Sequence, residues 1–184
     1  LVHKPDLVFM EFAVNDTYTE FCMNSYENLI RKILMSDSNP ALVLLFATNA
    51  VGGSSQDVQA ALGQYYNLPM LSYGKAVTPE VEAGSFVWSD IAEDIVHPNN
   101  MGHSIFAGLI ITYLEDLYGK LDTIEIKAER LQRYELPPPA TPQVYQNAHI
   151  ENAETITPLQ MLGYDVYDFN YHFGNNWYAM EDGS

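Results

Sequence analysis

The chain has 184 residues, of which 47% are hydrophobic and 17% charged, a globular composition with room for one ordinary domain and some additional structure. Its formal net charge is −16, from 24 acidic and 8 basic residues, which disfavours nucleic acid and anionic membrane surfaces as partners. The apolar runs are too short to span a bilayer, and the single Cys22 excludes an internal disulfide.

The N-terminal third predicts strands and helices in alternation. Residues 7–12 (Leu-Val-Phe-Met-Glu-Phe) form a short apolar run, which indicates a strand buried on both faces. Residues 17–35 carry apolar side chains at helical spacing, and the sequence Asp-Ser-Asn-Pro at 37–40 ends that helix. A second buried strand is expected at residues 41–47.

The pattern continues through the middle of the chain. Ser55 is expected to cap a helix that reaches Tyr66 and turns Val58, Leu62 and Tyr65 inward. A shorter strand is expected at 69–73, a short helix at 76–82, and a long helix from about Asn99 to a stop at Gly119. Alternating strands and helices predict an α/β fold, a three-layer parallel sheet with helices on both faces.

The composition changes near the C-terminus. We expect three parts: an α/β domain over residues 1–120, a connector with a Pro-rich linker over 121–142, and the beginning of a β-rich accessory domain over 143–184. The last prediction depends on aromatic residues that alternate with polar ones from Tyr167 to Phe173, which is strand periodicity.

One cluster of residues suggests covalent ester chemistry. Such hydrolysis needs a hydroxyl nucleophile, a base and donors for the oxyanion. His97 is the candidate base, and Asp94, three residues earlier, is the candidate carboxylate that orients it. Asn15 follows the first predicted strand, so its side-chain amide is placed at the sheet edge where ligands bind in such folds.

These residues resemble the SGNH (GDSL-type) hydrolases over about residues 5–119. Residues 5–16 (Pro-Asp-Leu-Val-Phe-Met-Glu-Phe-Ala-Val-Asn-Asp) resemble the third conserved block of that family, whose Asn contributes to the oxyanion hole. Asp94-Ile-Val-His97-Pro98-Asn99 resembles the fifth block, which carries the acid and base of the catalytic triad. The resemblance implies a flavodoxin-like SGNH hydrolase fold, with Asn15, Asp94 and His97 as catalytic residues.

The chain departs from the family pattern in two places. Ala13 stands where the third block usually has Gly, which is tolerable if that backbone is not at positive φ. The Gly-Asp-Ser block and the second-block Gly have no counterpart, and the resemblance places both before Leu1. We expect the nucleophilic serine there, because Ser54, Ser55, Ser72 and Ser104 suit loop, cap, strand and helix positions instead.

The sequence therefore predicts a serine-type acyl-ester hydrolase, expected to be a carbohydrate O-acetyl esterase that needs no cofactor and no metal. We expect a small-molecule or polysaccharide ester as substrate and a secreted or cell-surface protein, with a cytoplasmic location left open. The alternatives are an O-acyltransferase, a non-catalytic SGNH-like module that binds carbohydrate or protein, and a flavodoxin-like binding protein.

Each candidate residue also has an ordinary structural interpretation. His97 and Asp94 are common residue types in loops and turns, and Asn15 or Asp16 could cap the following helix. Trp88 suits a packing anchor better than a substrate platform. A metal held by Asp94, His97 and His103 is disfavoured, because His103 lies in the first turn of the next helix.

Overall fold

The computed structural model describes residues 4–120 and 135–148. Contacts group residues 1–146 into one compact unit, and every helix and strand discussed below lies in it. The predicted β-rich segment, including Tyr167 to Phe173, lies outside the described residues.

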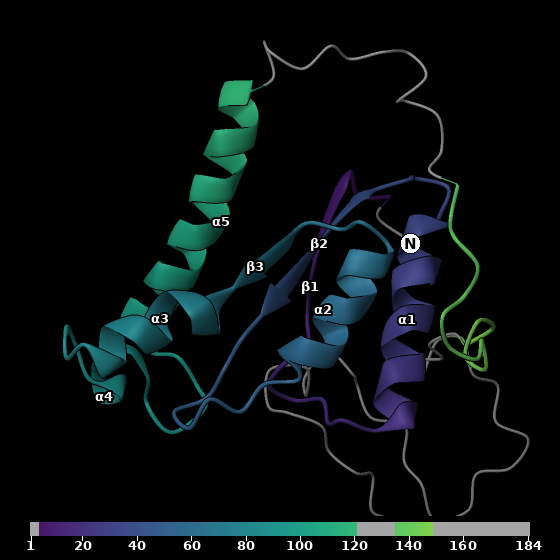
Figure 1. Ribbon diagram of the computed structural model, residues 1–184. Coiled ribbons are helices and arrows are strands. Elements are labelled where there is room, and N and C mark those ends of the chain that lie inside the picture. Colours follow the sequence, from purple (N-terminus) through teal and green to yellow (C-terminus); the bar gives the residue numbers. More distant parts are fainter. Residues whose placement is uncertain (1–3, 121–134, 149–184) are drawn as a thin grey trace, which may run out of the picture. The chain divides into compact units, whose positions relative to one another are not determined.

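The centre of the fold is an open parallel sheet of three strands in the order β1-β2-β3 (Figure 1). The strands are β1 (Leu7–Glu11), β2 (Ala41–Phe46) and β3 (Met70–Ser72). Leu7 pairs with Ala41, and Leu44 pairs with Met70. β2 is the most buried of the three, as expected for an apolar run that lies between two other strands.

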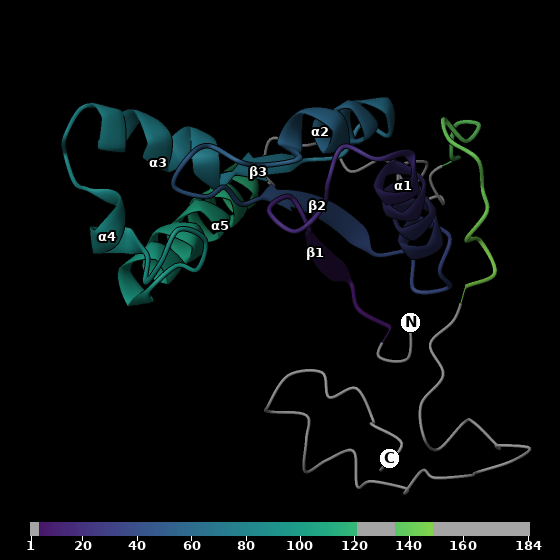
Figure 2. The same cartoon turned by 90° about the horizontal axis from the view of Figure 1, so that it is seen from below.

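Two helices, α1 (Glu20–Leu34) and α2 (Gln56–Tyr65), pack on one face of the sheet. Figure 2 shows them together on one side, with α5 on the other. Helical spacing directs one apolar stripe of α1 inward. The core of this layer consists of Met10, Ala13, Tyr26, Ile30, Ile33, Leu42, Leu44, Phe46, Leu62 and Tyr66.

A second, smaller core joins the remaining helices, α3 (Tyr73–Glu82), α4 (Trp88–Ile91) and α5 (Asn100–Lys120). Tyr73, Val77 and Ile91 are buried there, and Phe86, Trp88, Ile105, Phe106 and Leu109 pack around them. The predicted α/β fold with flanking helices is confirmed. The four-residue helix α4 was not predicted, because so short a segment shows no periodicity.

The structure corrects several details. Neither Asn15 nor Asp16 caps α1; Thr19 does, since its hydroxyl accepts a hydrogen bond from the Cys22 N–H at 3.2 Å. Tyr65 is 45% exposed rather than inward, and the buried aromatic residue at the end of α2 is its neighbour Tyr66. Gly119 does not end α5, which continues to Lys120.

The Pro-rich segment is bound to α1 along part of its length. The buried carboxylate of Glu27 accepts hydrogen bonds from the backbone N–H groups of Ala140 at 2.6 Å and Thr141 at 2.5 Å, and from the hydroxyls of Thr141 and Tyr66. Arg31 donates to the Pro137 carbonyl at 2.7 Å. Among the described residues, no helix is both long and apolar enough to cross a membrane.

Candidate active site

Three loops meet beyond the carboxyl ends of the parallel strands, the edge at which open α/β sheets bind ligands. They are the β1–α1 loop, the β2–α2 loop and the loop between α4 and α5. The Ser55 N–H donates to the Ala13 carbonyl at 2.6 Å, and the Ala50 N–H donates to the Ile95 carbonyl at 2.9 Å. The β2–α2 loop therefore connects the segment of Asn15 to the segment of Asp94 and His97.

Asp94 and His97 form the hydrogen-bonded pair that the sequence predicts. Asp94 Oδ2 lies 2.8 Å from His97 Nδ1. The other carboxylate oxygen, Oδ1, accepts the backbone N–H groups of Val96 and His97, each at 2.7 Å. Both side chains are accessible, with 75% of the His97 side chain and 53% of the Asp94 side chain exposed, so a ligand could approach the imidazole directly.

The protonation states follow from these contacts. Hydrogen bonds from the His97 backbone, the His97 ring and the Val96 backbone lower the pKa of Asp94 to about 2, so the carboxylate is ionised at neutral pH. An ionised carboxylate only accepts hydrogen bonds, so Nδ1 carries the proton of neutral His97 and Nε2 presents a lone pair. The hydrogen bond and charge of Asp94 in turn raise the pKa of His97.

Backbone contacts and one indole hold the loop that carries this pair. Ala92 and Pro98 form an antiparallel bridge, and the Glu93 N–H donates to the His97 carbonyl at 2.9 Å. Trp88 Nε1 donates to the Asp94 carbonyl at 2.8 Å. The sequence favoured a packing role for Trp88 over a substrate platform. Its hydrogen bond to the loop depends on tertiary contact and leaves no sequence signal.

The start of α5 fixes the other end of the loop. Asn99 Oδ1 accepts the N–H groups of Met101 at 2.9 Å and Gly102 at 3.1 Å, as an N-cap residue does. Gly102 is required there by close packing, since a Cβ at this position would lie 2.1 Å from the Ile91 carbonyl oxygen and 2.8 Å from Pro98 Cβ. The first turn of α5 can therefore approach α4 closely.

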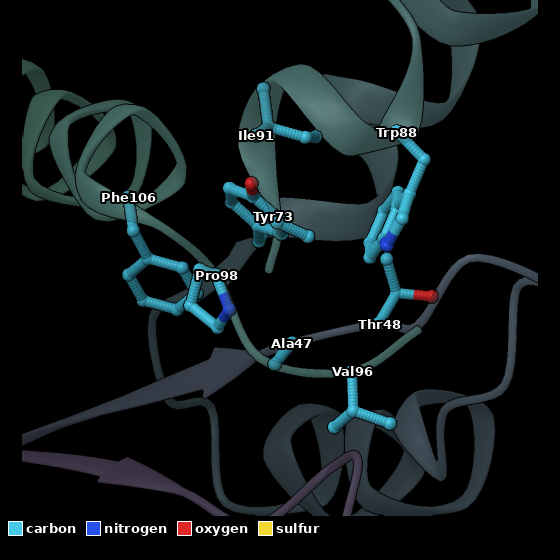
Figure 3. A pocket seen from close by; sticks show the side chains of 9 residues that line it. Ala47, Thr48, Tyr73, Trp88, Ile91, Val96, Pro98 and Phe106 are labelled. Atoms are coloured by element: carbon cyan, nitrogen blue, oxygen red, sulfur yellow. The ribbon is translucent and has the colours of Figure 1, made fainter. Parts of the chain in front are cut away.

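A small apolar cavity of about 40 Å³ lies beneath the loop. Val96 and Pro98, on either side of His97 in the chain, contribute to its wall, and Figure 3 shows the Trp88 indole beside Thr48 at one side. The remaining lining residues are Ala47, Tyr73, Ile91, Ala92 and Phe106. Their packing supports the loop from below, which leaves the Asp94–His97 pair on its outer side.

Asn15 lies in the turn that follows β1, as the sequence predicts. Its backbone N–H donates to the Phe12 carbonyl at 3.2 Å, and its exposed side chain has no hydrogen-bond partner in the part of the chain that the structure describes. The amide is thus available to a ligand. Ala13 is fully buried and has no positive φ, so this backbone does not need the glycine that the family pattern has there.

The structure therefore brings Asp94 and His97 into contact, and it places Asn15 on the same edge of the sheet without a direct contact to either. The four serines that the sequence assigned to structural positions use their hydroxyls elsewhere. Ser54 bonds the Ala47 carbonyl, Ser55 the Asp16 carbonyl, Ser72 the Gln56 side chain and Ser104 the Asn100 carbonyl. Within residues 4–120 and 135–148, no group of three or more His, Cys, Asp or Glu side chains could hold a metal ion.

Neither the protein-family models nor the curated proteins include one that matches this chain. Solved structures do match. The crystal structure of a two-domain esterase active on acetylated mannans, co-crystallised with mannopentaose, is 32% identical with a TM-score of 0.66 over 79% of this chain. A second structure of a two-domain esterase active on acetylated mannans is 33% identical with a TM-score of 0.68 over 77% of this chain. The chain spans 37% of the length of each, and over that part it has the fold of these esterases.

Proposed function

We propose that this chain carries the base, the orienting carboxylate and an oxyanion donor of an SGNH-type serine hydrolase that removes acetyl groups from carbohydrate. The single observation that carries the proposal is the contact of 2.8 Å between His97 Nδ1 and Asp94 Oδ2 in an accessible loop at the ligand-binding edge of the sheet. An isolated loop histidine would not need a carboxylate that is itself held by two backbone N–H groups.

The chemistry follows from this geometry. Because Asp94 keeps the proton of His97 on Nδ1, Nε2 can take the proton of a serine hydroxyl as that oxygen attacks the ester carbonyl. The imidazolium formed is stabilised by the adjacent carboxylate. It gives the proton to the sugar oxygen as the ester C–O bond breaks, so the sugar leaves with a free hydroxyl. Asn15 donates its side-chain amide to the oxyanion. Water then hydrolyses the acyl-enzyme through the same base.

The nucleophilic serine is proposed to lie upstream of Leu1. The hydroxyls of Ser54, Ser55, Ser72 and Ser104 all bond groups other than His97. The longer esterases of the same fold have room for further elements, since this chain spans 37% of their length. The substrate class is taken from those esterases, which act on acetylated mannans, and it suits an acidic protein that repels polyanions.

The experiment is a kinetic comparison of variants in the complete protein. Release of acetate from acetylated mannan is measured for the wild type, His97→Ala and a control, His103→Ala. His97→Ala is expected to lower kcat by roughly 10³-fold or more, because the general base and acid is lost. His103 is an exposed histidine in the first turn of α5, and its variant is expected to retain activity within about 3-fold.

Equal activity of wild type and His97→Ala would disprove the assignment of the base. Product analysis with an acceptor sugar present separates the two reactions that the same residues support. Free acetate as the dominant product indicates hydrolysis, whereas an acetylated acceptor indicates that the protein is an acyltransferase.

A further inference from the structure

The turn that carries Asn15 is held from beneath by side chains that the proposed mechanism does not use. The turn follows β1, and the N–H groups of Asn15 and Asp16 both donate to the Phe12 carbonyl, at 3.2 and 2.9 Å. Ala13, at its start, is fully buried. The Asn15 side chain is exposed, so its backbone is fixed on the inner side while its amide faces outward.

Ser55, at the N-terminus of α2, bonds the turn on both sides of Asn15. Its backbone N–H donates to the Ala13 carbonyl at 2.6 Å, and its hydroxyl donates to the Asp16 carbonyl at 2.7 Å. Ser55 was expected to cap α2, but its side chain forms no cap hydrogen bond. The hydroxyl is instead committed to the turn, and only 2% of the residue is exposed.

Gln59, one turn further along α2, adds a third contact. Its Nε2 donates to Asp16 Oδ2 at 2.9 Å, and only 1% of the residue is exposed. Its Oε1 is buried and has no partner among the described residues, so only one end of the amide is hydrogen-bonded. Burying an amide with one unpaired atom is costly, and the hydrogen bond to Asp16 offsets part of that cost.

Glu11, the last residue of β1, holds the turn from the sheet. Its Oε1 accepts the N–H groups of Ala13 at 2.8 Å and Ala47 at 3.1 Å. Ala47 directly follows β2, so one oxygen atom ties the start of the turn to the end of the neighbouring strand. Glu11, Ser55 and Gln59 thus contact the turn from β1 and α2.

We propose that Glu11, Ser55 and Gln59 are positioning residues that fix the Asn15 amide for oxyanion stabilisation. This inference rests on the proposed function, because it takes Asn15 as an oxyanion donor. Such donors act through fixed placement, so a small displacement of the turn is expected to cost rate while the affinity for the sugar is retained.

The test is a double-mutant cycle in the complete protein, with kcat and KM measured on acetylated mannan. Asn15→Ala is expected to lower kcat by roughly 10²–10³-fold. Ser55→Ala is expected to lower kcat by roughly 10- to 100-fold, with KM within about 3-fold. In the Asn15→Ala background, Ser55→Ala is expected to change kcat by less than about 2-fold, because the residue acts through an amide that is no longer present.

Two further variants guard against a purely structural effect. Ser54→Ala is the matched control, since this neighbouring hydroxyl bonds the Ala47 carbonyl and not the turn, and it is expected to stay within about 3-fold of wild type. Glu11→Gln keeps an oxygen that can accept both N–H groups, so it is expected to retain much more activity than Glu11→Ala.

The outcomes separate the two proposals. If Asn15→Ala leaves kcat unchanged, the role of Asn15 in the proposed function is wrong. If Asn15→Ala lowers kcat and Ser55→Ala lowers it further by the same factor in both backgrounds, the positioning role is overturned. Loss of rate by Ser55→Ala only in the presence of Asn15, with faster hydrogen exchange of the Asn15 and Asp16 amides, supports it.

Discussion

The chemistry proposed for this chain depends on one imidazole and the carboxylate beside it. Asp94 donates nothing and accepts three N–H groups, two from the backbone and one from the His97 ring. The carboxylate thereby orients the ring and fixes its tautomer. Because the contact is local, within a loop of four residues, it forms without the rest of an active site.

Asp94→Asn is expected to lower the pKa of His97. In the wild type the Asp94 hydrogen bond and charge raise that pKa above its ordinary value of 6.5, because they favour the protonated ring. The neutral amide removes the charge, so the ring should lose its proton at lower pH. An NMR titration of the His97 ring protons in both proteins measures the two midpoints.

An unchanged His97 midpoint in Asp94→Asn would show that the pair does not form in solution. The pH dependence of activity also follows from the protonation of His97. If His97 is the base, kcat/KM of the wild type must fall as pH decreases through the His97 pKa, since only the neutral ring accepts a proton.

At this scale the sequence predicted the pair and missed its supports. Asp94 and His97 are three residues apart, so their contact depends on local backbone geometry that the sequence reports. Trp88, Glu11 and Gln59 support the site through contacts between separate elements, and no residue spacing encodes those. The spacing of residues along the chain predicts contacts within a turn. Contacts between separate elements depend on tertiary packing, so they can be identified only from the structure.

At the scale of elements, the buried carboxylate of Glu27 joins α1, α2 and the Pro-rich segment. Burial alone would raise its pKa, but hydrogen bonds from the Thr141 and Tyr66 side chains and from the Ala140 and Thr141 N–H groups lower it below the ordinary 4.5. Helical spacing predicted the apolar stripe of α1 correctly. It did not predict that a fully buried acid lies on the same helix, since charged residues are seldom buried without partners.

Glu27→Gln is expected to lower the free energy of unfolding at pH 7 by roughly 2–3 kcal/mol, because hydrogen bonds to the ionised carboxylate are lost. The sign of the pH dependence follows from the lowered pKa. The stabilisation from Glu27 is fully present above the unfolded value of 4.5 and is lost as pH falls through the folded value. Urea denaturation of both proteins between pH 3 and pH 7 measures this difference.

Glu115→Gln, an exposed residue of α5, is the control and is expected to change stability by less than about 0.5 kcal/mol. If the difference between wild type and Glu27→Gln stays the same at every pH, the carboxylate is not the ionised acceptor of these hydrogen bonds.

At the scale of the whole molecule, the α/β fold predicted from the alternation of strands and helices is correct. The free edge of the sheet at β1 carries a further expectation. In the described residues β1 pairs only with β2, so one side of β1 has no strand beside it. An edge strand without a neighbour leaves its backbone N–H and C=O groups free to pair with a further strand. The matching esterases are longer than this chain, which spans 37% of their length, and the proposed serine segment would be expected beside β1.

The last prediction follows from that arrangement. A fluorophosphonate probe reacts with a serine only when a base activates its hydroxyl, and in the described part of this chain no serine hydroxyl is hydrogen-bonded to His97. The 184-residue chain is therefore expected to remain unlabelled. The complete protein is expected to be labelled, and its His97→Ala variant is expected to remain unlabelled. Gel fluorescence followed by mass spectrometry of the labelled peptide identifies the serine. Steady labelling of the isolated chain would place the nucleophile within these residues and contradict the proposed upstream position.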